Sequence, residues 1–580
     1  GVQPTTNLDF RHALTGIRFA VGQNLSWNKV IDKVELRNVL LKSKYVLSKK
    51  FDGTGAAWDH TGYSLRGNAV LSGISVSTSQ NPNVTIMGNV GDNYTFYMIP
   101  QQLTGHVTAY VHCTDGTTIT VPLKGKWKAG TTRTYKLSQT NSTWTYTLEG
   151  TDPSRAANYD ETASQVYTIK SFREDPATHI KQAVAWKVVG YDANGDGTFS
   201  MTEKPAWLTS LSKTEGDGGT AADQGTATLT KEVTNLLKKR NDGLKNATPL
   251  GTASAPYNLS NSTGAAPVEN TANSYLISAP GHYRIPLVYG NAIENGATNA
   301  NAYISHAAAG NSKVLYNFQD HAGNAIDNPW IEKTHGGANA GINGTKIVWA
   351  DEKDLVTSPS IAHDASNNAY LDFEVKATDI KSGNAVVAVT KGGTVVWSWH
   401  LWFAPKDALD KIPVTNHQGK VYNFTKETLG WKPTQWSGST YSSARTVKVK
   451  VEQTVANNGT KQDAVINITQ NPGSVKQGAT TLYQFGRKDA FPSVDASKLA
   501  ANSHFTENAG DNMSIQNGIQ HPDYYYTDGS NWQTNYRYYN LWSADNTASG
   551  FNDNPVVKTV YDPSPVGFKM PASNAFTGFT

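Results

Sequence analysis

The sequence predicts an all-β protein, made of several β-sandwich domains and a loop-rich C-terminal domain. Charged residues make up only 17% of the 580 residues, and Thr, Asn, Ser and Gly fill the difference. These residue types suit strands and turns rather than helices. Short stretches of alternating polarity recur along the chain, often beside Gly-containing turns. The 27 Tyr and 15 Trp supply enough apolar surface for several cores, which argues against disorder.

The length predicts three or four domains, at roughly 100–200 residues per domain. The clearest predicted strands are 14–21, 107–111, 118–121, 184–189, 385–389, 395–402, 447–451 and 464–469. Residues 1–150 predict a sandwich of about seven strands, with Ile17 and Phe19 on one face because strand side chains alternate. We expect a β-rich domain with short helices at 151–265, a β-sandwich at 266–475 and a loop-rich, aromatic domain at 476–580.

Charge and cysteine content exclude several classes of protein. The 51 Lys and Arg residues against 47 Asp and Glu give a formal charge of +4, which is weak for this length and makes nucleic acid a poor partner. The basic run Lys238-Lys239-Arg240 is interpreted as a solvated helix face. The single cysteine, Cys113, lies in an alternating stretch and predicts a buried free thiol, so neither an internal disulfide nor a cysteine zinc site can form.

One segment matches the spacing of a calcium-binding loop. Oxygen-bearing side chains stand at Asp192, Asn194 and Asp196, Thr198 supplies a backbone carbonyl, and Glu203 stands at the twelfth position. The flanks are not helical, and Pro205 would end a following helix early. The segment therefore has two interpretations, a Ca²⁺ site or an ordinary turn rich in Asp, Asn and Gly. No other cofactor is predicted.

No catalytic motif stands out, and the sequence predicts a protein that is not an enzyme. His400 lies among three tryptophans without a Cys or an acidic partner nearby in sequence, so we expect a hydrogen-bonded structural histidine. The chain has no G-x-S-x-G, H-E-x-x-H, G-x-G-x-x-G or P-loop pattern.

The densest aromatic cluster lies near the C-terminal end, interspersed with Asp, Asn and Gln. Such mixtures offer stacking faces and hydrogen-bond partners to sugars or proteins, although most tyrosines in a loop-rich domain serve its core. The candidate ligand-binding residues are Tyr524, Tyr526, Trp532, Tyr536 and Trp542. Because binding residues concentrate in loops, we expect the receptor-facing surface beyond residue 476.

Several blocks resemble fimbrillins of the Bacteroidales. Residues 10–19 and 127–130 resemble the opening and closing strands of the mature N-terminal sandwich, which is transthyretin-like in that family. The blocks 271–275, 279–283, 286–292, 383–389, 397–400, 486–492 and 560–571 are similar to those of large fimbrillin-like surface proteins. The last block is similar to the major paralogous domain that ends such proteins. The chain stops where the resembled domain would continue, so the resemblance implies that the last domain is incomplete here. Ser274 and Ser564 stand where relatives often carry Cys, so a bridge there is absent.

The resemblance implies a lipoprotein precursor that is exported to the outer membrane and held there through a lipid anchor. Removal of a first strand would leave a groove that accepts a donor strand from another pilus subunit. The extra C-terminal domains imply a pilus tip subunit and adhesin on the extracellular side, with a host protein or glycan as its receptor. Two alternatives remain, an outer-membrane glycan-binding lipoprotein that does not polymerise and a secreted glycan-active enzyme.

Overall fold

The structure is a computed structural model that divides the chain into two compact units. It describes residues 10–22, 29–62, 65–78, 95–137, 144–162, 164–175, 179–307, 310–457, 459–529, 531–532 and 538–578. Unit 1 comprises residues 1–232 and 441–472, and unit 2 comprises residues 233–440 and 473–580. The chain passes between the units after Glu232, Thr440 and Pro472.

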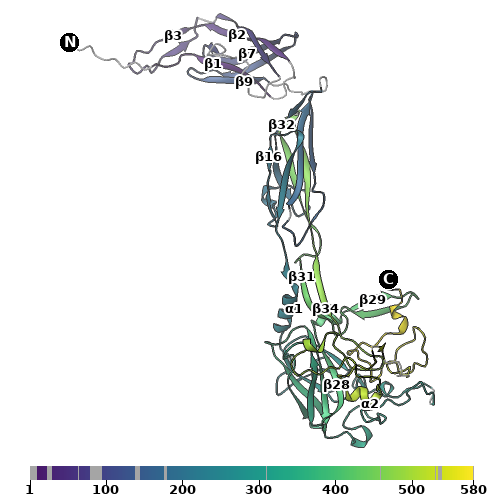
Figure 1. Cartoon of the computed structure of the whole chain (residues 1–580). Helices are drawn as coiled ribbons and strands as arrows, with labels where there is room; N and C mark the ends of the chain where they lie inside the picture. Colours follow the sequence, from purple (N-terminus) through teal and green to yellow (C-terminus); the bar gives the residue numbers. More distant parts are fainter. Residues whose placement is uncertain are drawn as a thin grey trace. The chain divides into compact units, whose positions relative to one another are not determined.

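Unit 1 begins with an N-terminal β-sandwich of two sheets, in the purple part of the chain (Figure 1). The first sheet has the order β6-β1-β9 and the second the order β5-β2-β7-β8. The strands are β1 (Thr15–Val21), β2 (Val30–Lys42), β5 (Leu65–Ser77), β6 (Phe96–Met98), β7 (Gln102–Cys113), β8 (Thr118–Lys126) and β9 (Thr132–Leu137), with a ribbon of β3 (Lys44–Val46) and β4 (Ala57–Asp59). One core cluster joins side chains of both sheets, including Phe19 of β1 and Val111 of β7.

Local sequence patterns predicted this sandwich well. Ile17 and Phe19 are both fully buried on the core face of β1, as alternation requires. Strands β7 and β8 form an antiparallel hairpin around Asp115-Gly116, and the thiol of Cys113 is buried and free. The all-β prediction is confirmed.

A second β-sandwich follows in unit 1. One sheet holds β10 (Thr145–Thr151), β12 (Ser164–Glu174), β13 (Lys181–Ala183), β15 (Leu208–Leu211) and β17 (Gly219–Leu229). The other holds β11 (Ala157–Asn158), β14 (Trp186–Asp192), β16 (Glu215–Gly216), β32 (Arg445–Asn457) and β33 (Thr460–Asn471). Its core joins Tyr167 and Ile169 of the first sheet to Trp186 and Val449 of the second.

The structure divides the chain differently from the four predicted domains. Strands β32 and β33 were expected within a domain at 266–475, but β32 pairs with β14 and places Val449 opposite Tyr191. Strand β10 already belongs to the second sandwich, so the first boundary falls before residue 145 rather than at 150. Local patterns identify β32 and β33 correctly but do not reveal the strands on either side of this hairpin, because β14 and β11 lie more than 250 residues away in sequence.

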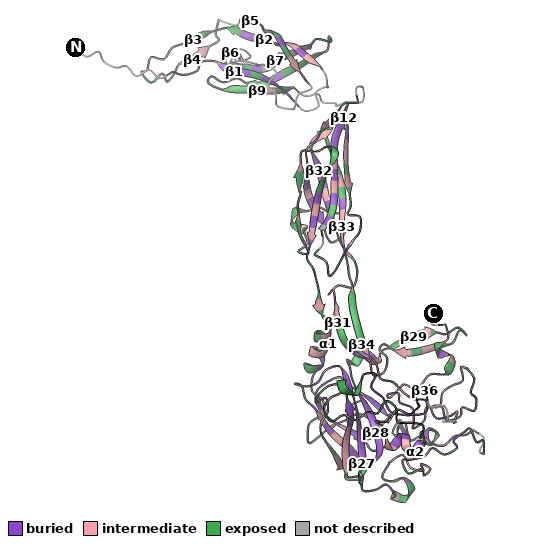
Figure 2. Cartoon of the chain, viewed as in Figure 1, coloured by how far each residue is buried: buried purple, intermediate pink, exposed green. Residues whose placement is uncertain are grey.

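Unit 2 has its core between two four-stranded sheets. The first sheet has the order β20-β28-β27-β24 and the second the order β19-β21-β26-β25. Their bounds are β19 (Tyr257–Asn258), β20 (Ser274–Ile277), β21 (Gly281–Pro286), β24 (Gly344–Ala350), β25 (Thr357–His363), β26 (Ala369–Val375), β27 (Gly383–Lys391) and β28 (Thr394–Phe403). Strands β27 and β28 are buried on both faces, which Figure 2 shows as purple ribbons.

Shorter elements surround this core. The strands are β18 (Thr234–Asn235), β22 (Ile293–Glu294), β23 (Ala297–Thr298), β29 (Lys411–Thr415), β30 (Val421–Thr425), β31 (Lys432–Gly438), β34 (Ser474–Ala479), β35 (Thr527–Asp528) and β36 (Asn531–Trp532). The helices are α1 (Leu236–Lys245), α2 (Ile515–Gln520) and the 3₁₀ turns η2 (Ala300–Ala302), η3 (Thr334–Gly337), η4 (Lys406–Leu409), η5 (Ala496–Lys498) and η6 (Ser573–Phe576). A further 3₁₀ turn, η1 (Met201–Glu203), belongs to unit 1. Among the described residues, no helix is both long and apolar enough to cross a bilayer.

Helix α1 corrects the interpretation of the basic run. Lys238 is exposed, but the Arg240 side chain is 6% exposed and makes a bidentate ion pair with Glu427, at 2.6 and 2.7 Å. Its Nε also donates to the Ser382 hydroxyl. Arg240 therefore fixes α1 to the rest of unit 2, because a planar guanidinium matches a carboxylate at two points.

The C-terminal region lies within the core of unit 2 rather than in a separate domain. Leu541 and Tyr561 belong to the same hydrophobic cluster as Trp397 of β28. The buried Asn273 amide donates to the carbonyls of Val560 and Asp562, at 2.7 and 2.8 Å. These long-range contacts overturn the predicted domain at 476–580, since its apolar side chains complete a core that begins at Leu244.

Candidate ligand-binding site

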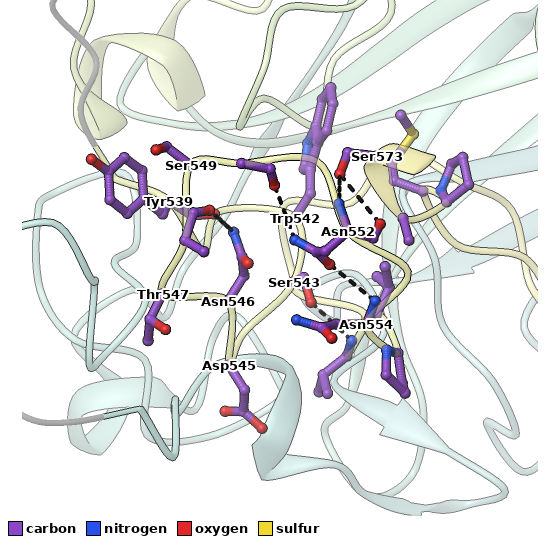
Figure 3. A pocket seen from close by; sticks show the side chains of 18 of the residues that line it. Tyr539, Trp542, Ser543, Asp545, Asn546, Thr547, Ser549, Asn552, Asn554 and Ser573 are labelled. Carbon is purple, nitrogen blue, oxygen red and sulfur yellow. Dashed lines mark hydrogen bonds between the residues drawn. The ribbon is translucent and has the colours of Figure 1, made fainter. Parts of the chain in front are cut away.

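A pocket of about 680 Å³ lies in the C-terminal part of unit 2 (Figure 3). Its volume is within the range of about 300–1,000 Å³ that is usual for small-molecule sites. Lining residues within 542–557 make up most of the wall, and Met570, Pro571, Ala572, Ser573 and Phe576 make up a second part of it. Tyr539 and Phe485 complete the lining.

Aromatic side chains provide the apolar part of the lining. Trp542 is half-buried, and its indole N–H donates to the Arg487 carbonyl at 3.2 Å, which fixes the ring. Phe485 packs edge-on against Trp542, with ring centroids 5.2 Å apart. Phe576, on η6, is 59% exposed. Rings held beside solvent in this way offer apolar surface to a ligand.

Neutral polar side chains provide most of the remaining pocket lining. Three asparagines of one loop, Asn546, Asn552 and Asn554, line the pocket together with Ser543 and several small residues. The Asn546 amide donates to the Tyr539 carbonyl at 2.8 Å, and the Ser543 hydroxyl accepts from the Val557 N–H at 3.1 Å. These bonds hold the loop in shape because each satisfies a backbone group that regular structure leaves unpaired.

Two further contacts join the loop to the 570–576 segment. The Asn552 N–H donates to the Ser573 hydroxyl at 2.8 Å, which Figure 3 shows as a dashed line. The Asn574 N–H donates to the Asn552 carbonyl at 3.0 Å. The two sides of the pocket are therefore connected, and the cavity is a built feature of the fold.

Asp553 lies outside the pocket lining and connects the pocket loop to neighbouring segments. Its carboxylate accepts hydrogen bonds from the Tyr422 hydroxyl at 2.5 Å, the Asn416 amide at 2.8 Å and the Asn574 amide at 3.1 Å. The hydrogen bond from Tyr422 lowers the pKa of Asp553, so the group is ionised at neutral pH. Through it, the hairpin of β29 and β30 and the η6 segment are tied to the pocket loop.

The five predicted aromatic residues have different positions. Trp542 lines the pocket. Tyr526 is 2% exposed and packs beside the Arg487 guanidinium, so it serves the core and presents no face to a ligand. Tyr524 is half-buried and stacks on His521 at 4.5 Å. Trp532 belongs to the short strand β36, and Tyr536 lies outside the described residues, so their binding roles remain predictions.

Sequence reasoning missed most of the pocket. Phe485, Phe576 and the asparagine loop were not among the candidates, because they are far apart in sequence or lack a motif. A usable signal was the run of small polar residues at 543–554, which directly follows the aromatic cluster and contains no regular periodicity.

The predicted calcium loop is a series of side-chain-capped turns. Asp192 is buried, and its carboxylate accepts from the N–H groups of Gly195 and Gly197, at 2.6 and 3.2 Å. Asp196 accepts from the Thr198 N–H at 2.7 Å. No three His, Cys, Asp or Glu side chains of the described residues come together as a metal site requires. The carboxylates of Asp192, Asp196 and Glu203 do not form such a group, so the geometry favours the turn, and calcium binding stays a prediction.

His400 is a structural residue, as expected from its surroundings. It is 1% exposed and lies between the Asn384 side-chain oxygen at 2.9 Å and the hydroxyls of Ser274 and Tyr483 at 3.2 and 3.4 Å. Burial lowers the pKa of His400 to about 3, so the ring is neutral at physiological pH.

A buried serine and lysine also resemble a catalytic pair. The Ser398 hydroxyl donates to Asp489 at 2.7 Å, and the Lys488 ammonium contacts both groups. Burial lowers the pKa of Lys488, but the carboxylate beside it offsets part of this effect. The cavity beside Lys488 measures about 10 Å³, which is space for about one water molecule and none for a substrate.

Comparison with known proteins adds one family assignment. Residues 2–151 match the fimbrillin-like family. No curated protein matches the chain. Among solved structures, an endo-fucoidan hydrolase of glycoside hydrolase family 107 is 13% identical with a TM-score of 0.09; the match covers 23% of this chain and 24% of the hydrolase.

Two other solved structures match over more of the chain. A protocadherin gammaB7 fragment is 8% identical with a TM-score of 0.12, over 79% of this chain and 98% of that one. A SusE-like, surface-located polysaccharide-binding protein of Bacteroides thetaiotaomicron is 7% identical with a TM-score of 0.06, over 82% of this chain and 74% of that one. TM-scores this low do not establish a common fold.

The match at 2–151 covers the sandwich that holds β1 to β9 and extends over β10 of the second sandwich. It confirms the resemblance that residues 10–19 and 127–130 carry, whereas the similarity of the C-terminal blocks to the major paralogous domain remains a prediction. The N-terminal part of this chain is therefore a fimbrillin-like domain.

Proposed function

We propose that this chain is a fimbrial adhesin at the pilus tip, which joins other subunits through its N-terminal sandwich and binds a receptor with unit 2. The observation that carries the proposal is that the family match and the largest described feature for ligand binding, the pocket, lie in different units of one chain. The fimbrillin-like match covers the first sandwich, and the 680 Å³ pocket lies in the other unit. A stalk subunit has no need of such an additional unit, whereas a tip subunit uses it for recognition.

Assembly by β-strand addition is supported by the edges of the first sheet. Within the described residues this sheet has three strands, and its edge strands β6 and β9 each pair only with β1. An edge strand presents unpaired N–H and C=O groups on its outer side, which a strand of another subunit can pair with. The mainly exposed side chains of β9 leave its backbone accessible.

The proposed activity is binding rather than catalysis. His400 is neutral and buried, and the Ser398–Lys488 pair has no room for a substrate. The pocket at 542–576 contains one carboxylate, Asp545, and lacks the second acidic group that most glycoside hydrolases use. The receptor is a host protein or a glycan, and the precursor is held at the extracellular face of the outer membrane by a lipid anchor.

A non-polymerising glycan-binding lipoprotein is the second candidate, because the same pocket would serve it. Immunogold electron microscopy of cells that express the full chain separates the two. The proposal predicts gold particles at fibre ends. Labelling along the fibres would identify a stalk subunit, and labelling confined to the cell envelope would favour the non-polymerising lipoprotein; either result overturns the tip assignment.

A further inference from the structure

We infer that the pocket at 542–576 binds an uncharged saccharide, a ligand rich in hydroxyl groups and without carboxylate, sulfate or phosphate. This inference rests on the proposed recognition function of unit 2 and names its ligand class. It is independent of how the N-terminal sandwich assembles.

The charge of the lining excludes an anionic ligand. The lining residues include one ionisable acid, Asp545, and no Lys, Arg or His. Asp545 accepts from the His306 N–H at 2.9 Å, and the His306 ring lies 3.6 Å from the same oxygen. Lys313 lies outside the lining and interacts with Tyr539, where its hydrogen bond lowers the pKa of the phenol. Sialylated or sulfated glycans would therefore meet no free cation in the pocket, although such groups are usually bound by Arg or Lys.

The polar groups of the pocket suit hydroxyl ligands. Asn and Ser side chains both donate and accept, as sugar hydroxyls do. Within the described part of the chain, the side chains of Thr547 and Asn554 have no hydrogen-bond partner, and both are exposed. Neighbouring polar side chains are already engaged in holding the loop, so the pocket pairs a fixed frame with free donors and acceptors. Such pre-organisation reduces the entropy lost on binding.

The aromatic rings suit the C–H face of a sugar ring. Trp542 and Phe485 are fixed by their mutual contact and by the indole hydrogen bond. Phe576 also lines the pocket, and its ring packs against Phe424 with centroids 5.5 Å apart. Flat apolar surfaces beside amide groups match the two faces of a pyranose, one apolar and one hydroxylated. An apolar peptide would cover the Thr547 and Asn554 side chains without pairing them, which is costly.

The test uses the full chain and immobilised oligosaccharides of two kinds. One set ends in neutral hexoses or N-acetylhexosamines, and the other carries the same backbones with sialic acid or sulfate. We expect binding to the neutral set, with little change between low and physiological salt, because no ion pair contributes.

Two matched pairs of variants locate the site. Phe576→Ala and Asn554→Ala remove exposed lining groups. Their controls are Phe551→Ala, an 82% exposed ring in the same loop that does not line the pocket, and Asn301→Ala, an exposed asparagine on η2. We expect each lining variant to weaken binding by about tenfold, equivalent to about 1.4 kcal/mol, with an unchanged melting temperature, and the controls to bind as wild type.

Each remaining outcome overturns the inference. Binding to acidic glycans alone would refute the charge argument. Equal binding by lining and control variants would place the site elsewhere, and capture of an apolar peptide in place of any glycan would refute the ligand class. Absence of glycan binding would also refute it, while gold labelling at fibre ends would still support the tip role, so the two failures can be told apart.

Discussion

Acidification should destabilise unit 2 through His400. The ring is fixed in one tautomer, because the Asn384 amide nitrogen donates to Asp351 and to the Gly430 carbonyl and leaves its oxygen facing Nε2 of His400. Nε2 therefore carries the proton and donates. On the other side Nδ1 meets only two hydroxyls, those of Ser274 and Tyr483. None of these partners is an anion that would stabilise a second proton.

The size of the effect follows from proton linkage. Burial lowers the folded-state pKa of His400 to about 3, whereas an unfolded histidine titrates near about 6.5. Between these values the unfolded chain binds a proton that the folded chain does not. Stability is thus unaffected above the unfolded pKa and falls as the pH drops through this window. At pH 4.5, two pH units below the unfolded pKa, the loss is about 2.7 kcal/mol.

Urea unfolding followed by tryptophan fluorescence at pH 7 and 4.5 measures the loss. The comparison of wild type with His400→Gln isolates the histidine, because the other buried groups titrate in both proteins. Among these, burial raises the pKa of Asp562 and lowers that of Lys558. The acid-induced loss of stability should be smaller in His400→Gln by about 2.7 kcal/mol, although the variant is less stable at pH 7. Equal losses would show that His400 is not a buried neutral group.

Three further predictions concern the turn and the pocket frame. Asp192→Ala leaves the N–H groups of Gly195 and Gly197 without their acceptor and should lower the unfolding free energy of unit 1 by about 1–3 kcal/mol in urea melts. Calorimetry at millimolar calcium should give no binding heat with wild type, because the loop carboxylates do not converge; heat that disappears in Asp196→Ala would contradict this. Asp553→Ala should speed proteolysis of the 416–425 hairpin, since three side chains lose their common acceptor, and an unchanged cleavage rate would count against its supporting role.

Local sequence patterns determined the strands of this protein, since alternation and turn residues act over only a few positions. Ile17 and Phe19 are buried together as predicted, and Asp115-Gly116 closes a hairpin. The free, buried Cys113 also follows from the sequence alone, because a single cysteine in an alternating stretch has no partner. The fimbrillin-like identity of residues 2–151 was likewise visible in the sequence.

Only the tertiary structure decided which strands and side chains meet. Residues 441–472 complete a sandwich that begins near residue 145, and the C-terminal segment supplies Tyr561 to the core of β28. Arg240 is a buried residue that fixes α1, and Tyr526 is a core residue, because partners distant in sequence cover them. The pocket arose in the same way, from Phe485, residues 542–557 and Phe576. Sequence periodicity reports which face of an element is apolar, but the partner of that face is selected by packing over the whole chain.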